Sequence, residues 1–142
     1  MRVMVLVKSS LEIEAGTLPT EQELTEMGQY NETLVNAGIM LEGEGLQSSA
    51  KGVRIDFAGG GTSAVTDGPF AETKELLAGY SIWQVESMDE AVEWAKKAPF
   101  GAGAQLELRQ IFDAADFGEA YTPELQAQDD KLREKIQSRS QE

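Results

Sequence analysis

Two short segments of the chain are apolar at both odd and even positions. Residues 3–7 are apolar without interruption, and in residues 80–85 Tyr80 and Ile82 would lie on one side of a strand, with Trp83 and Val85 on the other. Strands that are apolar on both sides are typical of the interior of a sheet whose two faces are both covered. The pattern therefore predicts two central strands.

Two helices are predicted by capping boxes that precede apolar stripes. Thr20 stands three residues before Glu23, and Ser87 stands three residues before Glu90, the spacing at which side chains bond the free amides of a helix start. Gly38 is expected to end the first helix. The apolar residues behind the caps recur at helical spacing: Leu24, Met27, Tyr30, Leu34 and Val35, and then Met88, Ala91, Val92, Ala95 and Ala98.

The other segments predict loops and antiparallel strands. Residues 9–19 are rich in loop-forming residues, residues 39–46 and 53–57 predict strands, and the three glycines at 59–61 predict a hairpin turn into a strand at 63–66. The last predicted strand, residues 105–111, alternates leucines with Glu107 and Arg109, so one of its faces is charged. The charges in residues 70–78 fit either a strand or a helix.

The predicted order of elements indicates an α+β domain of the ferredoxin-like kind, β-α-β-β(-β)-α-β, over residues 1–112. Its two helices cover only one face of the antiparallel sheet. Since the central strands are apolar on both sides, we expect a second copy to lie sheet against sheet, which gives a homodimer that encloses a cavity.

Residues 113–142 form a polar C-terminal extension that is expected to belong to the same unit. Thr122 followed by Pro123 predicts a helix start, and Leu125, Leu132 and Ile136 give that helix a narrow apolar seam. We expect this extra helix to dock lightly on the body or on a partner.

Composition limits the chemistry that the chain can perform. With 12 basic and 25 acidic residues, its formal charge is −13, which disfavours direct binding of nucleic acid or of an anionic membrane. The 142 residues include neither cysteine nor histidine, so thiolate chemistry is excluded and the commonest neutral-pH base is missing. No carboxylates stand at metal-ligand spacing, and neither a metal nor a cofactor is predicted. The short apolar amino terminus does not resemble a signal segment, so the cytoplasm is the expected location.

Asp67 is the candidate catalytic base. A carboxylate beside Gly68 and Pro69 sits on a constrained backbone that can aim it, as general base catalysis requires. A structural role explains the same residue, because aspartate before such a turn commonly accepts hydrogen bonds from it. Both roles remain open.

Four further residues are candidates for ligand binding. Arg109 could hold a substrate carboxylate by two parallel hydrogen bonds, with Glu107 beside it as a second candidate base, or the two could form structural ion pairs. Tyr80 and Trp83 could line a pocket, although aromatic residues on a two-sided strand more often pack in a core or an interface.

Residues 65–75, Val-Thr-Asp-Gly-Pro-Phe-Ala-Glu-Thr-Lys-Glu, resemble the signature of the DGPF branch of the YCII-related family. Further likeness at residues 43–46, 49–54, 79–80, 87–91 and 107–109 extends the resemblance over most of residues 1–112. It implies a dimeric α/β-barrel of ferredoxin-like subunits and no settled activity. The histidine and aspartate proposed for the name-giving branch align near Met27 and Asn36, and Gln47 stands where close relatives often have histidine, so that mechanism does not carry over.

Three kinds of function follow from these patterns. The first is a homodimeric binding or regulatory protein whose cavity holds a small organic ligand. The second is an enzyme that uses Asp67 for acid-base chemistry on a small organic substrate. The third, implied by the resemblance, is an interaction module that works with a sigma factor.

Overall fold

The computed structural model describes all of residues 1–142, which form two compact units, Met1–Gln110 and Ile111–Glu142. The first unit contains a four-stranded antiparallel sheet, whose strands lie in the order β2-β5-β1-β6. These strands are β1 (Arg2–Lys8), β2 (Met40–Gly45), β5 (Leu77–Gln84) and β6 (Leu106–Gln110). Helix α2 (Glu21–Asn36) connects β1 to β2, and α3 (Met88–Ala95) connects β5 to β6. This connectivity and strand order give the ferredoxin-like α+β fold that the sequence predicts.

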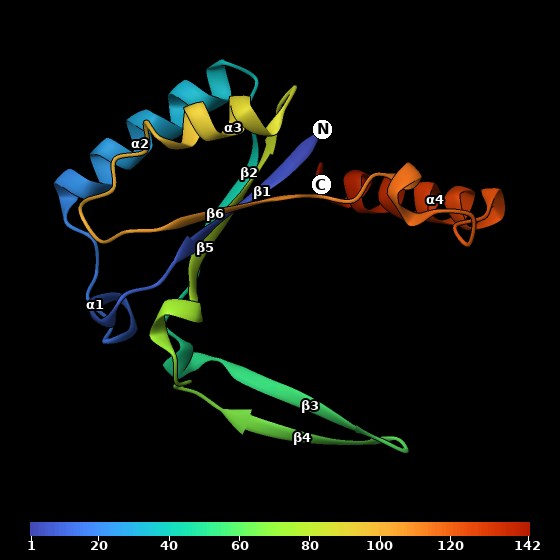
Figure 1. Cartoon of the computed structure of the whole chain (residues 1–142), viewed down its shortest axis with the longest axis horizontal. Helices are drawn as coiled ribbons and strands as arrows, with labels where there is room; N and C mark the ends of the chain where they lie inside the picture. Colours follow the sequence, from blue (N-terminus) through green and yellow to red (C-terminus); the bar gives the residue numbers. More distant parts are fainter. The chain divides into compact units, whose positions relative to one another are not determined.

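The core of the first unit lies between one face of this sheet and the two helices (Figure 1). Val3 and Val5 of β1 and Trp83 of β5 are almost fully buried there, against Leu34 of α2 and Ala91 of α3. The predicted caps form: the Thr20 hydroxyl accepts a hydrogen bond from the Glu23 amide at 3.1 Å. The side chain of Ser87 caps α3 in the same way.

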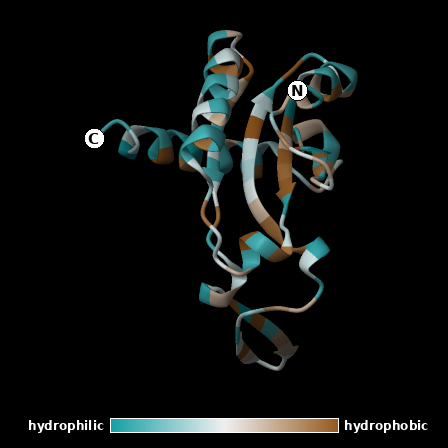
Figure 2. Cartoon of the chain, turned by 90° about the vertical axis from the view of Figure 1, so that its left-hand side faces the viewer, coloured by the Kyte–Doolittle hydropathy of each residue, from teal (hydrophilic) through white to brown (hydrophobic).

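The other face of the sheet has no helix layer within residues 1–110 (Figure 1). Along β1, buried Val3 and Val5 alternate with half-buried Met4 and Leu6, so the strand is apolar on both sides although only one side is covered. Figure 2 shows the resulting hydrophobic bands along the strands. We call this uncovered side the open face.

Several predicted details differ from the structure. Residues 9–19 contain a short helix, α1 (Leu11–Glu14), because the Ser10 hydroxyl caps it by accepting from the Ile13 amide. Leu24 and Val35, predicted on the buried stripe of α2, are more than half exposed, since the core contacts only a narrow arc of that helix. Residues 70–78 combine one 3-10 turn, Thr73–Glu75, with the start of β5.

A two-stranded hairpin, β3 (Val53–Gly59) and β4 (Thr62–Asp67), is inserted between β2 and β5 and extends away from the sheet (Figure 1). Its turn contains the predicted glycines, all with positive φ, which glycine adopts without steric cost. Every residue of both strands is exposed. Four large apolar side chains share one side of the hairpin by the pairing register: Val53, Ile55, Phe57 and Val65.

The turn after β4 is tied to the turn before β3. The Gly68 amide donates to the Gly52 carbonyl at 2.9 Å, and the Phe70 amide donates to the Ser49 hydroxyl at 3.1 Å. The ring of Phe70 lies 3.9 Å from the guanidinium carbon of Arg54, a cation–π contact. Ser49 is held in turn by Glu14 of α1, whose carboxylate accepts from the Ser49 amide at 3.0 Å and from its hydroxyl. The base of the hairpin is therefore fixed to α1.

The second unit consists of a 3-10 segment, Ala114–Phe117, and helix α4 (Pro123–Arg139), which begins at Pro123 behind the predicted cap Thr122. Phe112 stacks on Phe117 at a centroid distance of 4.7 Å, and Phe117 contacts Tyr121 at 5.1 Å. The apolar seam of α4 is largely exposed. None of the helices of either unit has the length and apolar character that crossing a membrane requires.

We predict that Tyr30→Phe lowers the free energy of unfolding by about 0.5–1.5 kcal/mol near neutral pH, because the Tyr30 hydroxyl donates to the Trp94 carbonyl at 2.7 Å. Burial raises the pKa of Tyr30 to about 12 from an ordinary value of 10.0. As the pH rises, Tyr30 therefore loses its proton in the unfolded chain before it does so in the folded chain. The extra stability of wild type over the variant should shrink from about pH 10 and be lost through about pH 12. Urea unfolding of both proteins across this range measures the difference, and a constant difference would contradict the assignment.

We predict that Gly68→Ala destabilises the chain by about 1–3 kcal/mol or more, because a Cβ atom there would lie 1.7 Å from the Ser49 carbonyl oxygen, which belongs to rigid backbone. Gly28→Ala is the matched control, since a Cβ atom on Gly28 of α2 has nothing within 4 Å. That control should stabilise the helix by about 0.5–1 kcal/mol. Thermal unfolding compares the two variants, and equal melting temperatures would contradict the tight fit at Gly68.

Candidate functional site

The open face is the candidate functional site, because the strand register gathers an apolar centre and charged groups on it. Residues of β5, β1 and β6 that pair with one another form rows across this face. One row contains Tyr80, Leu6 and Glu107, and the next contains Ile82, Met4 and Arg109. Glu42 and Glu44 of β2 complete these rows at the far edge. The centre of the face is therefore apolar, and its two edges are charged.

The β2 edge holds a tyrosine–carboxylate pair. The Tyr80 hydroxyl donates to Oε1 of Glu42 at 2.9 Å. This hydrogen bond, together with partial burial and the negative charges of Glu42 and Glu44, raises the pKa of Tyr80 above its ordinary value. Tyr80 presents its ring to the open face, together with a hydroxyl that is held by Glu42.

The β6 edge holds a chain of three charges. Glu107 lies 3.5 Å from the Lys8 ammonium through one oxygen and 3.5 Å from the Arg109 guanidinium through the other. Lys8 is only 14% exposed, whereas the side chain of Arg109 is 72% exposed. Arg109 can thus reach a ligand's carboxylate while Glu107 orients it.

Trp83 and Asp67, two other predicted site residues, do not lie on the open face. Trp83 is 2% exposed and projects to the helix side of β5, opposite to Tyr80, so these two aromatic residues do not line one surface. Asp67 ends β4 of the exposed hairpin, in the two-stranded sheet, and its carboxylate forms no hydrogen bond or ion pair. Gly68 and Phe70, rather than the Asp67 side chain, make the hydrogen bonds of the turn. A catalytic role of Asp67 stays a prediction.

Sequence reasoning missed Lys8 and Glu42 as members of the site. Lys8 has the same parity as Met4 and Leu6 and could have been found from that alternation. Glu42 carried no comparable signal, because its position opposite Ile82 follows a register shift between β2 and β5 that local sequence does not specify. No three acidic side chains gather closely enough to hold a metal ion.

We predict that Glu42→Gln lowers the pKa of Tyr80 toward its ordinary value, because the substitution removes the charge of the carboxylate that accepts the Tyr80 hydroxyl. Carbon NMR of ring-labelled tyrosine measures the titration of each residue. Tyr121 is an internal control: its pKa is raised by a hydrogen bond to Asp129 and should not move. An unchanged Tyr80 titration would show that the pair does not persist in solution.

Three comparisons relate the chain to known proteins. The model of the YCII-related domain matches residues 1–115. An uncharacterised protein from Rhizobium meliloti (strain 1021) is 50% identical over 36 residues, which are 25% of this chain and 29% of that protein, so the match spans under a third of the relative's length.

Among solved structures, 5-chloro-2-hydroxyhydroquinone dehydrochlorinase from Burkholderia phenoliruptrix AC1100, in complex with 2,5-dihydroxybenzoquinone, is similar to this chain at 18% identity and a TM-score of 0.43. The match covers 81% of this chain and 98% of that one. A likeness at this level says nothing of function. The family match covers most of the sequence, and on that ground the chain belongs to the YCII-related domain family.

Proposed function

We propose that the chain is a homodimeric binding protein that holds a small organic molecule between the open faces of two copies. The observation that carries this proposal is the open face itself, where half-buried Met4, Leu6 and Ile82 lie between the Tyr80–Glu42 pair and the Glu107–Arg109 pair. A small ligand site typically has an apolar lining with a few fixed polar groups, which is the composition of this face.

A second copy is the occupant that suits this face. A layered α+β domain is stable when both faces of its sheet are covered, and α2 and α3 cover only one. The chain as a whole carries a formal charge of −13, yet the open face carries equal numbers of acidic and basic residues, so two copies can approach there without net repulsion. These residues are Glu42, Glu44 and Glu107, and Arg2, Lys8 and Arg109.

The polar groups define the kind of ligand. An exposed guanidinium suits a carboxylate, and the Tyr80 ring and neighbouring aliphatic side chains suit an apolar or aromatic body. We therefore propose an amphipathic organic acid as the ligand class.

Acid-base catalysis by Asp67 is less well supported than binding. Asp67 lies on the exposed hairpin, whereas Tyr80, Glu107 and Arg109 lie on the four-stranded sheet. The polar groups that could hold a substrate are therefore on a different surface from the candidate base.

We predict that Leu6→Glu weakens dimer formation by about 30-fold or more, because it places a charge in the apolar centre of the proposed interface. Leu24→Glu, the same substitution at an exposed position of α2, should leave the dimer unchanged. Sedimentation velocity over a range of concentrations measures the association. A wild-type chain that sediments as a monomer at micromolar concentration would sink the dimer proposal.

Native mass spectrometry of the same preparations tests ligand binding. Wild-type dimer should retain a small molecule, and Arg109→Ala dimer should lose it while remaining dimeric. Equal retention by both proteins would remove Arg109 from the site.

A further inference from the structure

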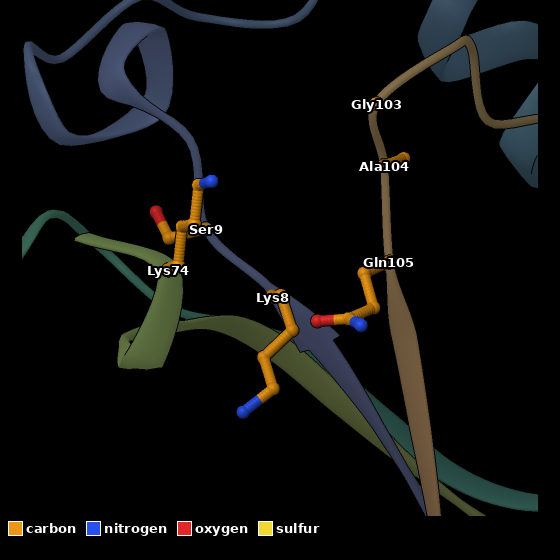
Figure 3. A pocket seen from close by; sticks show the side chains of 6 residues that line it. All are labelled: Lys8, Ser9, Lys74, Gly103, Ala104 and Gln105. Atoms are coloured by element: carbon orange, nitrogen blue, oxygen red, sulfur yellow. The ribbon is translucent and has the colours of Figure 1, made fainter. Parts of the chain in front are cut away.

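A cavity lies at one end of the sheet, apart from the centre of the open face. It is half open to solvent, has a volume of about 330 Å³ and is lined by residues from three places in the sequence: the end of β1, the 3-10 turn before β5 and the segment that leads into β6 (Figure 3). The lining residues are Lys8, Ser9, Lys74, Gly103, Ala104 and Gln105. The volume is at the lower end of the range of ligand pockets and suits a small molecule.

The lining of this cavity is basic, although the chain is acidic and the ammonium of Lys8 is already paired with Glu107 at 3.5 Å. Acidic residues outnumber basic ones by 25 to 12, yet the lining contains two lysines and no carboxylate. Lys74 is exposed and forms no ion pair, although Glu72 and Glu75 stand next to it in the sequence. Its ammonium is therefore free to attract an anion from solution to the cavity.

Ser9 and Gln105 add hydrogen-bond donors. The Ser9 amide donates to the Leu76 carbonyl at 2.9 Å, but the Ser9 hydroxyl is buried and has no hydrogen-bond partner. A buried hydroxyl without a partner costs free energy, and rotation about its Cα–Cβ bond toward the cavity would break no hydrogen bond. The side chain of Gln105 extends from its strand toward the strand of Lys8 (Figure 3), where its amide nitrogen can donate.

We propose that this cavity binds a small oxyanion, the carboxylate or phosphate group of a metabolite. Lys74 supplies the main positive charge, and the Ser9 hydroxyl and the Gln105 amide donate hydrogen bonds to the anion's oxygens. All the lining residues belong to one chain, and one of them, Lys8, also lies at the edge of the open face.

Lys8 couples this cavity to the open face. Its side chain points away from Gln105 (Figure 3), and its ammonium lies 3.5 Å from Glu107. Glu107 has Arg109 as a second cationic partner at the same distance. An anion in the cavity therefore competes with Glu107 for the ammonium of Lys8. If Lys8 rotates toward the anion, Glu107 still has its ion pair with Arg109. Removing the charge of Glu107 should strengthen anion binding.

Titration calorimetry of the full-length chain with inorganic phosphate, and separately with malonate, tests the proposal. Wild type should bind at least one of these anions saturably. Tighter binding of inorganic phosphate would identify a phosphate group as the preferred ligand, and tighter binding of malonate would identify a carboxylate. Lys74→Gln should weaken binding about tenfold or more, since a hydrogen bond to a charged group is lost, and Ser9→Ala should weaken it less. Glu107→Gln should tighten it. Added NaCl should weaken it.

Lys96→Gln is the matched control, because Lys96 is an exposed lysine of the α3 end that pairs with Glu93, and its loss changes the net charge equally. The Lys96→Gln variant should bind the anion with the same affinity as wild type. The site is overturned if neither anion binds saturably, or if Lys74→Gln and Lys96→Gln weaken binding to the same extent, which would indicate a general effect of net charge. Circular dichroism confirms that each variant is folded. A monomeric wild-type protein that still binds the anion would refute the proposed dimer and leave this site standing.

Discussion

The structure depends on the alternation of side chains along β1 and β5, the two interior strands of the sheet. Because successive residues of a strand point to opposite sides, one face of these strands receives Val3, Val5 and Trp83, and the other receives Met4, Leu6 and Tyr80. The first set forms the core with the helices. The second set points away from that core. A shift of the strand by one residue would bring it into the core, but would move the first set out at the same time. The open face and its charged edges follow from this constraint.

A second constraint holds the inserted hairpin in place. An isolated two-stranded hairpin is marginally stable in water, and in this chain its base is fixed by hydrogen bonds and a cation–π contact rather than by a core. Gly68 lies so close to the Ser49 carbonyl that a larger residue would not fit, and Phe70 reaches Ser49 through its amide. The resemblance at residues 65–75 therefore reports the architecture of a turn. It does not by itself report chemistry at Asp67.

Much of the fold could be predicted from the sequence because its signals are local. Thr20 and Ser87 start helices through contacts within one turn, and two-sided apolar runs mark the central strands. The helix α1 was missed because four residues are too few to show a period. The exposure of Leu24 and Val35 was missed because helical spacing does not say how wide an arc the sheet will contact.

The candidate site was less predictable because it is assembled from distant segments. Strand parity predicted that Glu107 and Arg109 share one face of their strand and that Tyr80 and Ile82 share one face of theirs. That these two faces coincide follows only from the pairing of both strands with β1. The partnership of Tyr80 with Glu42 depends on a register shift in β2, and the cavity lined by Lys8, Lys74 and Gln105 brings together the end of β1, a 3-10 turn and the segment that leads into β6. No spacing within the sequence encodes either arrangement.

The exposed hairpin also bears on how the protein behaves in concentrated solution. Each of its strands has one edge with unpaired backbone groups, and Phe57 beside the turn is 85% exposed, so the hairpin offers a template to which further strands could add. At neutral pH and low salt, the large negative charge of the chain opposes such contacts between hairpins by long-range repulsion. Protonation of the carboxylates in mild acid, or screening by salt, removes that repulsion. The acidic composition therefore opposes the addition of further strands to the edges of this hairpin.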